Sequence, residues 1–451
     1  MKIDDRAKIL FFTIDCGLSS FRLIQLTRKK CILAPYLGCM RAIYSFLMGL
    51  SGFFIRLSAF FSPKMKLFVA GRKEVFPKLQ KHLKDSDKTL WMHCASLGEY
   101  EQGLPVLKEL RKLFPSHKIV LTFFSPSGYE VKKNNAEADV VCYMPLDTLS
   151  NAKRFVATVH PDIAMFVKYE IWPNFLLELQ SRKIPALLVS GLFRPNQIYF
   201  RSEGGWMRKI LKTFHHFFVQ NQSSKDLLES IAVTNVTVSG DTRFDRVSQQ
   251  LDLDNRLAFV EEFLGDHPCI VIGSSWAEDM EILNDFINTS SGTLKFIIAP
   301  HEIKAEKMVD LQKKISKKSL LFSQKKNKDL SAHNVLIVDT IGLLSSIYSY
   351  ADIAYVGGGM GAAGLHNVLE PATFGVPVVI GKNYQNFPEA VALQKRGGLF
   401  SVSTKTELAE VMHQLMEESA RKNAGKACKN YIMENKGATQ KIVDYISKFS
   451  F

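Results

Sequence analysis

The stretch TLWMHCASLGEYEQGLPVLKELRKLF, residues 89–114, contains the pattern that decides the fold. Its first seven residues form a largely apolar run, which is typical of a strand buried on both faces of a sheet. A short turn follows, and beyond it apolar residues recur with helical spacing. Another apolar run, KIVLTFF, begins at Lys118. The segment therefore predicts a strand, a helix and a parallel strand, which together make one βαβ unit.

The same alternation continues along the chain in two series. The first series of apolar runs comprises residues 89–95, 118–124, 140–146, 162–167, 185–191 and 216–221. After a polar stretch, the second comprises residues 269–275, 294–300, 334–339, 352–358, 377–381 and 398–402. The pattern predicts an α/β protein with two Rossmann-like, doubly wound domains and a cleft between them. We assign residues 63–245 to the first domain and residues 246–451 to the second.

Length and composition agree with two globular domains. The chain has 451 residues, of which 46% are hydrophobic and 23% are charged. Lys and Arg exceed Asp and Glu by 58 to 44, which favours anionic partners such as phosphates, acidic lipids or nucleic acid. The seven cysteines form no CxxC pair and no Cys/His cluster. Their spacing supports neither a disulfide framework nor a zinc site, and it favours a reducing compartment.

The N-terminal region has two parts. Residues 1–39 form an extension whose apolar run ILFFTI has no small-residue cleavage site behind it, which argues against a secretory signal. Because the character of the chain changes at Met40, we consider this residue a candidate translation start, which would leave the extension untranslated. Residues 40–62 are rich in Phe, Leu and Ile and predict a membrane-associated helix.

A helical plot of this segment separates a polar stripe from apolar residues. The stripe comprises Arg41, Ser45, Gly49, Gly52 and Arg56. The uninterrupted apolar run is shorter than the ~20 residues of a full span, so a helix in the membrane interface is a strong alternative to a spanning helix. The third alternative is a helix buried in a protein core.

The turn after residues 89–95 places a carboxylate at a helix start. We expect Gly98 to allow a tight turn and Glu99 to lie in the first turn of the helix, where the macrodipole favours a negative charge. A general base has to be ionised and to face a cleft, and this position fits both requirements. Acidic residues are also common there for helix stability alone, so the residue type leaves both interpretations open.

Two other turns in the first half carry candidate ligand-binding residues. Ser125 and Ser127 in LTFFSPSGYE could bind a polar ligand or cap the next helix. In KYEIWPN, Glu170 could accept hydrogen bonds from sugar hydroxyls or hold the loop, and Trp172 could contact a ligand or belong to the core.

A glycine-rich segment, YVGGGMGAAGLHNVLEP at residues 355–371, gives the strongest signal in the second half. We expect a helix to begin near His366, so that its free N–H groups form an anion site. His366, Asn367 and Glu370 could then bind a phosphate and a ribose diol, although glycine-rich turns also occur for many other reasons. The glycines concerned are Gly357, Gly358, Gly359, Gly361 and Gly364.

Further turns are expected to face the same cleft. Arg243 could clamp a phosphate or form a surface salt bridge. Ser274 and Ser275 could hold a nucleotide or cap a helix, and His301 could contact a base or ribose or be structural. Asn386 lies in a loop that enters a helix.

Several classes of protein lack support in the sequence. The chain has no Ser-His-Asp order, HExxH motif or Walker A motif, which argues against hydrolases, metalloproteases and kinases. The basic residues are scattered and no RNA-binding motif accompanies them, so nucleic acid is not an expected partner.

Taken together, these segments resemble those of the Kdo transferases, the family that moves 3-deoxy-D-manno-octulosonic acid (Kdo) from CMP-Kdo onto a lipid A precursor in lipopolysaccharide biosynthesis. The segments that match are HCASLGEYEQGLPV, LTFFSPSGYE, YMPLD, YEIWPN, GDTRFD, APHE and GGGMGAAGLHNVLEPATFGVPVVIG with NFPEA. They run from about residue 40 to the C-terminus in the family's order. The resemblance implies a GT-B fold and association with the cytoplasmic face of the inner membrane, an anionic surface, through the N-terminal helix.

The resemblance also implies roles for individual residues. Glu99 is the expected catalytic base, the first domain is expected to bind the acceptor and the second to bind CMP-Kdo, and neither a cofactor nor a metal is expected. The implied acceptor-binding residues are Ser96, Gly98, Ser125, Ser127, Glu170 and Trp172. The implied donor-binding residues are Arg243, Ser274, Ser275, His301, Gly357, Gly358, Gly359, Gly361, Gly364, His366, Asn367, Glu370 and Asn386.

Three positions depart from the commoner family pattern. Many relatives have Ser-Thr-His where this chain has Ser274-Ser275-Trp276, Lys where Arg243 stands, and Arg-His where Pro300-His301 stands. We interpret these changes as a variant of the kind expected in Bacteroidetes-like Gram-negative bacteria. The expected reaction is inverting: Glu99 takes a proton from an acceptor hydroxyl, the oxygen attacks Kdo, and CMP leaves. The alternatives are a GT-B glycosyltransferase that uses a UDP-sugar and a membrane-bound nucleotide-binding scaffold.

Overall fold

The computed structural model describes residues 29–449, with side chains described from Gly38 onward. Most of the predicted N-terminal extension, residues 1–28, lies outside the described residues. The absence of a secretory signal and the candidate translation start therefore stay predictions.

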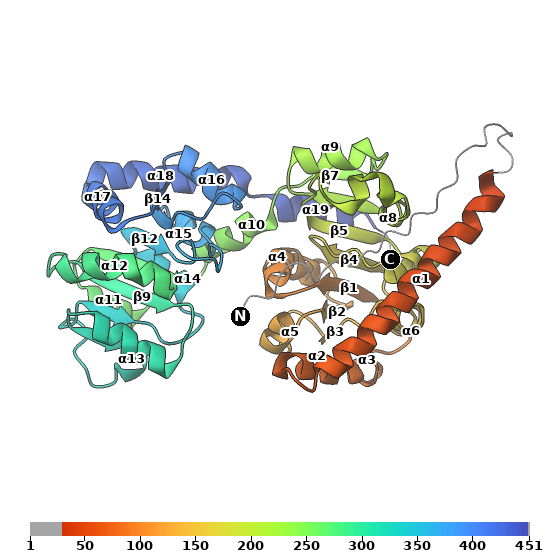
Figure 1. The fold of residues 1–451 in the computed structure, drawn as a ribbon, viewed down its shortest axis with the longest axis horizontal. Coiled ribbons are helices and arrows are strands. Elements are labelled where there is room, and N and C mark those ends of the chain that lie inside the picture. Colours follow the sequence, from red (N-terminus) through yellow and green to blue (C-terminus); the bar gives the residue numbers. More distant parts are fainter. Residues whose placement is uncertain (1–28, 450–451) are drawn as a thin grey trace.

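Two seven-stranded parallel sheets confirm the tandem α/β architecture (Figure 1). The first has the order β3-β2-β1-β4-β5-β6-β7 and the second the order β10-β11-β9-β8-β12-β13-β14. The strands of the first are β1 Thr89–Cys94, β2 Lys118–Phe123, β3 Val140–Tyr143, β4 Ile163–Val167, β5 Ala186–Gly191, β6 His216–Val219 and β7 Val236–Val238. Those of the second are β8 Cys269–Ser275, β9 Lys295–Pro300, β10 Ser319–Leu321, β11 Val335–Ile337, β12 Ile353–Val356, β13 Val378–Gly381 and β14 Leu399–Val402.

Helices cover both faces of each sheet, as expected for strands that are buried on both sides. Around the first sheet lie α2 Pro63–Lys73, α3 Val75–His82, α4 Leu97–Leu113, α5 Pro126–Lys132, α6 Leu149–Val159, α7 Pro173–Ser181, α8 Gly205–Leu211 and α9 Gln222–Ser230. Around the second lie α11 Ala258–Leu264, α12 Ala277–Thr289, α13 Ala305–Lys314, α14 Leu344–Ile347, α15 Leu369–Thr373, α16 Pro388–Lys395, α17 Lys405–Met416 and α18 Glu418–Asn435.

A glycine brings helix α4 close to the first sheet. All six residues of β1 are buried, and Gly103 of α4 faces them. A Cβ atom at Gly103 would lie 2.9 Å from Met92 Sδ and 3.2 Å from Val167 Cγ2. Glycine costs helix stability, but here its small size allows close contact with two strands. The contact positions the N-terminal turn of α4, which carries Glu99, directly beyond β1.

The N-terminal helix α1, Lys29–Ser58, lies along one side of the first domain. It therefore begins before the predicted start at Met40 and ends before the predicted residue 62. The part from Gly38 to Ser58 is long and apolar enough to cross a membrane, and only 6% of its apolar window is buried. A helix buried in a protein core is thus excluded for this segment.

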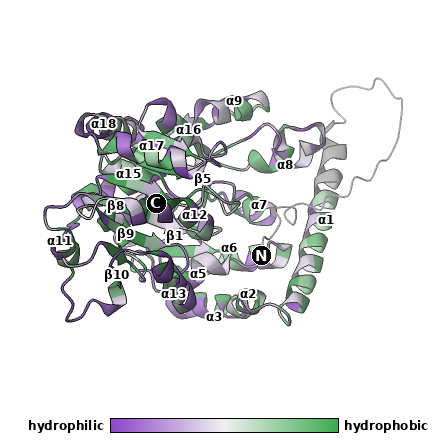
Figure 2. Ribbon diagram, turned by 60° about the vertical axis from the view of Figure 1, so that its left-hand side comes forward, coloured by the Kyte–Doolittle hydropathy of each residue, from purple (hydrophilic) through white to green (hydrophobic). Residues whose placement is uncertain are grey.

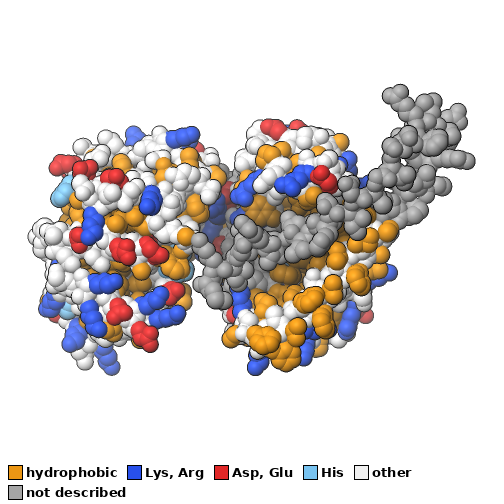
Figure 3. Space-filling view, in the orientation of Figure 1, with side chains coloured by type: hydrophobic (Ala, Val, Ile, Leu, Met, Phe, Trp, Pro, Cys, Tyr) orange, Lys and Arg blue, Asp and Glu red, His pale blue; other side chains and the backbone are white. Residues whose placement is uncertain are grey.

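The two faces of α1 differ as the helical plot predicts. Arg41 Nε donates to Asn174 Oδ1 at 2.9 Å, and Asn174 Nδ2 donates to Ser45 Oγ at 2.9 Å. A Cβ at Gly52 would lie 2.8 Å from Leu146 Cδ1, so the small and polar stripe faces the first domain. Many residues of α1 are hydrophobic (Figure 2), and hydrophobic side chains gather along the side of the helix that Figure 3 shows. Phe46 is 70% exposed.

The chain connects the two domains twice. Helix α10, Thr242–Ser248, lies at the crossing from the first sheet to the second. The last helix, α19 Ala438–Ile446, returns to the first domain, where Ile442 and Ile446 join the apolar cluster that contains β1. Asp245 of α10 accepts hydrogen bonds from the N–H groups of Gly437 and Thr439 at the start of α19. The predicted domain boundaries stay a prediction, and the structure adds that α19 packs with the first domain.

Candidate active site

The predicted residues of the first domain lie where β1, β2 and β4 end. Strand β1 pairs with β2 on one side and with β4 on the other, so the chain order reverses between β1 and β4. Such a reversal opens a crevice beyond the carboxyl ends of the strands. Glu99 follows β1 and Glu170 follows β4. The two carboxylates therefore flank this crevice.

Glu99 occupies the first turn of α4, as predicted. Ser96 is the N-cap residue, and its Oγ donates a hydrogen bond to the Glu99 carboxylate. This donor fixes the position of the carboxylate at the N-terminal end of the helix dipole. Gly98 differs from the expectation, because it is the second residue of α4 and has no positive φ. A Cβ atom at Gly98 would have no neighbour closer than Ser96 Oγ at 3.8 Å, so the turn does not depend on this glycine.

A lysine that the sequence analysis did not single out lies near Glu99. Lys168 follows β4 and has a φ of +71°, which is rare for a non-glycine residue. Burial lowers the pKa of Lys168, and the negative charge of Glu99 opposes that shift. Arg243 also acts on Lys168 and lowers its pKa. This crevice therefore contains a cation beside the candidate base.

The turn after β2 contacts the turn after β1. Ser125 N donates to Ala95 O at 2.7 Å, which joins the two turns. Ser125 is the N-cap residue of α5, and its Oγ accepts a hydrogen bond from Ser127 N at 3.3 Å. The two hydroxyl oxygens lie 2.9 Å apart. In this structure both serines thus serve the helix cap, which was one of the two predicted interpretations.

Glu170 and Trp172 form a small cluster with a buried histidine. Trp172 Nε1 donates to Glu170 Oε2 at 2.9 Å. His93 Nε2 lies 3.4 Å from the same oxygen, and its Nδ1 lies 2.9 Å from Thr122 Oγ1. His93 is fully buried within β1. The indole holds the Glu170 carboxylate at the edge of the crevice, and the buried His93 Nε2 lies beside it without a hydrogen bond.

In the second domain the glycine-rich loop follows β12 as predicted, but the helix begins later. Helix α15 starts at Leu369 instead of near His366 and has only five residues. Asn367 Oδ1 accepts from Leu369 N at 3.2 Å, so Asn367 satisfies an N–H group at the helix start. The intervening residues remain irregular because the loop is fixed by contacts with other strands.

The buried side chain of Asp279 fixes this loop. Its Oδ2 accepts from Gly358 N at 2.8 Å and from Trp276 N at 2.9 Å, and its Oδ1 accepts from Tyr355 OH at 3.0 Å. Gly358 has a φ of +92°, and a Cβ there would lie 2.1 Å from Gly364 O. Three of the other predicted glycines are also tightly packed, whereas a Cβ at Gly364 would have no neighbour closer than Phe387 Cζ at 3.8 Å. A Cβ would approach Ser274 O at Gly357, the Gly381 backbone at Gly359 and Glu278 at Gly361.

Three aromatic rings lie together beside the loop. Trp276 and His301 stack with ring centroids 4.2 Å apart, and His301 lies 4.7 Å from His366. Trp276 Nε1 donates to His366 Nε2 at 3.2 Å. Burial, with a smaller effect from His301, lowers the pKa of His366 to about 4. His366 is therefore neutral at pH 7, and its Nδ1 carries the proton because Nε2 accepts a hydrogen bond.

The remaining predicted donor residues differ in their availability. Glu370 is held by Ser345 Oγ at 2.9 Å and Asn367 Nδ2 at 3.1 Å, and burial raises its pKa. Ser275 has a buried Oγ without a hydrogen-bond partner among the described residues. Ser274 has a φ of +53° at the end of β8. Asn386 is exposed just before α16.

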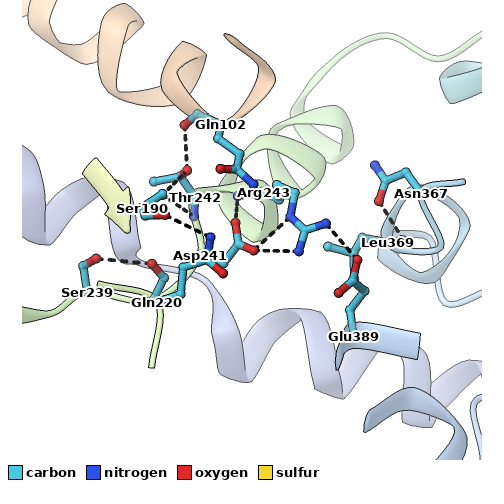
Figure 4. Close-up of polar contacts among 11 residues, drawn as sticks. Gln102, Ser190, Gln220, Ser239, Asp241, Thr242, Arg243, Asn367, Leu369 and Glu389 are labelled. Atoms are coloured by element: carbon cyan, nitrogen blue, oxygen red, sulfur yellow. Dashed lines mark hydrogen bonds and ion pairs between the residues drawn. The ribbon is translucent and has the colours of Figure 1, made fainter. Parts of the chain in front are cut away.

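Arg243 joins the two domains (Figure 4). Its Nη1 donates to Glu389 Oε1 of α16 at 2.8 Å, and its Nε donates to Asp241 Oδ2 at 2.8 Å. Nearby, Arg246 Nε donates to Glu101 Oε2 of α4 at 3.0 Å. Arg243 is thus a partly buried bridge between two carboxylates, and α10 links the two predicted sets of residues.

Several residues of this region were outside the predicted set, among them His93, Lys168, Asp241 and Asp279. Asp279 could have been found, because it follows the N-cap residue Trp276 by three positions, which is the spacing of a capping carboxylate. His93 gives no signal within an apolar strand. Among the described residues, no group of three His, Cys, Asp or Glu side chains could hold a metal ion. The expected reaction without metal or cofactor stays a prediction.

Comparison with known proteins identifies the family. The profile described as 3-Deoxy-D-manno-octulosonic-acid transferase (kdotransferase) matches residues 70–246. The chain is 30% identical over 352 residues to the 3-deoxy-D-manno-octulosonic acid transferase of Aquifex aeolicus, covering 76% of this chain and 90% of that protein. It is 25% identical over 373 residues to the enzyme of the same name from Haemophilus influenzae, covering 80% of this chain and 87% of that protein.

Solved structures agree on the fold. UDP-GlcNAc 2-epimerase from Neisseria meningitidis aligns with a TM-score of 0.59 at 18% identity, covering 80% of this chain and 100% of that chain. This likeness and the two parallel sheets show a GT-B fold. The chain therefore belongs to the 3-deoxy-D-manno-octulosonic acid transferases, a family of glycosyltransferases that transfer Kdo in lipopolysaccharide biosynthesis.

Proposed function

We propose that this chain transfers Kdo from CMP-Kdo to a hydroxyl of a lipid A precursor, with inversion at the anomeric carbon and with Glu99 as the general base. The observation that supports this most strongly is the placement of Glu99 at the strand-order reversal, beyond β1, with Ser96 donating to its carboxylate. In a GT-B protein this crevice faces the second domain, where a nucleotide sugar would bind.

The reaction needs one proton transfer and one displacement. The acceptor hydroxyl would give its proton to Glu99 while its oxygen forms a bond to the anomeric carbon of Kdo. The bond from that carbon to the phosphate oxygen of CMP would break, and its electron pair would leave with CMP. Holding both substrates in line across the interdomain crevice would lower the barrier.

The arrangement of the other residues suggests how they would contribute. Glu170 and Trp172 would orient the acceptor sugar beside Glu99, because their side chains are fixed at the crevice edge. The glycine-rich loop and the neutral His366, whose Nδ1–H can donate, would contact the donor. Lys168 and Arg243 would offset the charge that develops on the departing phosphate.

The contacts of α1 support a place on the membrane surface. Residues Arg41, Ser45 and Gly52 contact the first domain along one face of the helix. A helix attached to a soluble domain along its length cannot be surrounded by lipid there, so we infer that α1 lies in the interface with its apolar face in the membrane. An acylated acceptor resides in the same membrane, and the cytoplasmic face of the inner membrane would bring it together with the soluble donor.

Release of CMP from CMP-Kdo, with and without a tetra-acylated lipid A precursor, tests the proposal. Acceptor-dependent release by the wild type should fall by at least about a hundredfold in Glu99→Gln, as general-base catalysis contributes that much. Binding of CMP should be retained, which a thermal shift can measure. If UDP stabilises the protein and CMP does not, a UDP-sugar enzyme is the better interpretation. Unchanged turnover in Glu99→Gln would exclude this residue as the base.

A further inference from the structure

A partly buried arginine without a carboxylate partner lies beside α1. Arg72, in the last turn of α2, donates from Nη1 to Phe68 O at 3.1 Å and from Nη2 to Phe124 O at 2.9 Å. The ring centroid of Phe68 lies 3.5 Å from its guanidinium carbon, and that of Tyr143 lies 5.0 Å away. Burial lowers the pKa of Arg72 to about 9.

Arg72 lacks the partner that a cation withdrawn from water normally has. Its buried Nε has no hydrogen-bond partner, and no described carboxylate is among the groups that act on its charge. Removing a charge from water is costly unless an opposite charge compensates it. Backbone carbonyls and aromatic faces compensate only part of a full charge. The site is therefore electrostatically suited to an anion.

A cavity of about 440 Å³ provides room for such an anion. It lies between α1, α2 and the loop after β3. Two further cations, Arg56 of α1 and Lys73 of α2, line it, and none of its lining residues is acidic. Both are exposed and form no ion pair with a described residue. The remaining wall is largely apolar and includes Ile55, Phe68 and Leu146.

The cavity is connected to the candidate active site through Phe124. The carbonyl of Phe124 accepts from Arg72, and its ring lies 4.8 Å from that of Trp172. The next residue, Ser125, is bonded to Ala95 in the turn that leads to Glu99. Arg56 of α1 lines the cavity, and the next residue of that helix, Leu57, is 49% exposed. A larger hollow of about 620 Å³ lies beside Gln180 and Thr213, among different elements of the first domain.

We propose that this cavity binds a phosphate group of the acylated acceptor. A phosphate monoester carries about −1.5 to −2 charges at pH 7, which three cations can neutralise. A ligand with a phosphorylated sugar and acyl chains would place the phosphate against Arg56, Arg72 and Lys73 while its chains follow the apolar face of α1. Its sugar would then extend past Phe124 towards Glu99. The inference rests on the proposed function, because it assigns a subsite for that acceptor.

The double substitution Arg56→Gln/Lys73→Gln tests this subsite. Both side chains are exposed, so we expect the protein to fold, whereas a change at Arg72 could disturb packing. The probes are a phosphorylated acyl-disaccharide acceptor and the same molecule without phosphates. We expect the KM of the phosphorylated acceptor to rise about tenfold, since charge-assisted hydrogen bonds are among the stronger ones. The KM of the dephosphorylated acceptor, the KM of the donor and kcat should stay unchanged.

A matched control removes the same charge elsewhere. Lys81 and Lys84 are exposed, belong to the same domain and do not line the cavity. The variant Lys81→Gln/Lys84→Gln should retain the wild-type KM for both acceptors. If the Arg56/Lys73 variant loses both acceptors equally, or neither, the cavity does not bind the acceptor phosphate. The same conclusion follows if the control changes KM as much as the test variant does.

Two binding measurements separate this inference from the proposed function. Equilibrium binding of the two acceptors in detergent micelles requires no turnover. A wild type that binds the phosphorylated form more tightly, with the preference lost in the variant, would support the cavity even if no Kdo transfer were detected. Co-sedimentation with phosphatidylglycerol vesicles provides the other measurement. If the variant loses vesicle binding but keeps its preference for the phosphorylated acceptor, the cavity binds bulk lipid headgroups and the proposal is wrong.

Discussion

Replacing Glu389 by Gln tests whether the arginine that joins the two domains is available to the phosphate of the donor. Arg243 is satisfied by two carboxylates, Glu389 from α16 and Asp241 from its own turn. A phosphate can reach the guanidinium only by displacing one of them. Asp241 also accepts from Arg243 N at 2.9 Å as the N-cap residue of α10. Glu389 is therefore the partner that a donor would displace.

The size of the effect follows from the geometry of the pair. The Arg243 Nη1 to Glu389 Oε1 distance is 2.8 Å, and the two side chains are 30% and 9% exposed. A charge-assisted hydrogen bond contributes about 1.5–3 kcal/mol, and the exposure of Arg243 places this one at the lower limit. Since 1.4 kcal/mol corresponds to about a tenfold change in an equilibrium constant, Glu389→Gln should lower the KM for CMP-Kdo about tenfold. Its kcat should change little.

The assay measures the initial rate of CMP release as a function of CMP-Kdo concentration, together with CMP binding by calorimetry. Glu434→Gln provides the control, because Glu434 pairs with the exposed Arg396 at 2.6 Å within the same domain. This control removes an equal charge and should leave the donor KM unchanged. An unchanged or raised KM in Glu389→Gln, with a lowered unfolding temperature, would refute the reasoning and make Arg243 a structural bridge only.

Two further predictions concern stability. Burial raises the pKa of Asp147 from 3.8 to about 7, although Tyr44 and two N–H groups donate to its carboxylate. Because the native pKa is raised, the protonated Asp147 contributes to the free energy of unfolding below pH 4, and this contribution is lost as the pH rises to 7. The loss amounts to up to about 4 kcal/mol, at 1.36 kcal/mol per pKa unit. Asp147→Asn should flatten this part of the pH profile of denaturant unfolding, and an unchanged slope would show that another group causes it. Gly358→Ala should lower the unfolding temperature and weaken CMP binding, because the φ of Gly358 is +92° and a Cβ there would collide with Gly364 O. An unfolding temperature and a CMP affinity equal to those of the wild type would contradict the loop geometry.

Sequence patterns predicted the elements whose signal is local. The long buried strands were found because a continuous apolar run between two helices is compatible with few structures other than a buried strand. β7 and β10, of three residues each, were missed because no longer apolar run marks them, whereas the equally short β11 was found within the run at residues 334–339. The start of α15 was placed three residues too early, since its position depends on Asp279 and other contacts of the loop with distant strands.

The candidate site was predictable where position alone determines it. Glu99 and Glu170 were found because residues beyond the carboxyl ends of parallel strands line the crevice. The partners of Arg243 were not, because Glu389 lies 146 positions away and the pairing depends on how the domains are arranged. The role of His93 likewise required the structure, because burial in β1 hides its contact with Glu170.

The return of α19 to the first domain bears on how the crevice can open and close. With a single connection, the two domains could rotate about any axis through that connection. Two connections, at α10 and at the junction of α18 with α19, define a line, and Asp245 ties them together. Movement about such a line is a hinge rotation about one axis. The two domains approach or separate, but they do not slide past each other. Each closure would then bring the same edges of the two domains face to face.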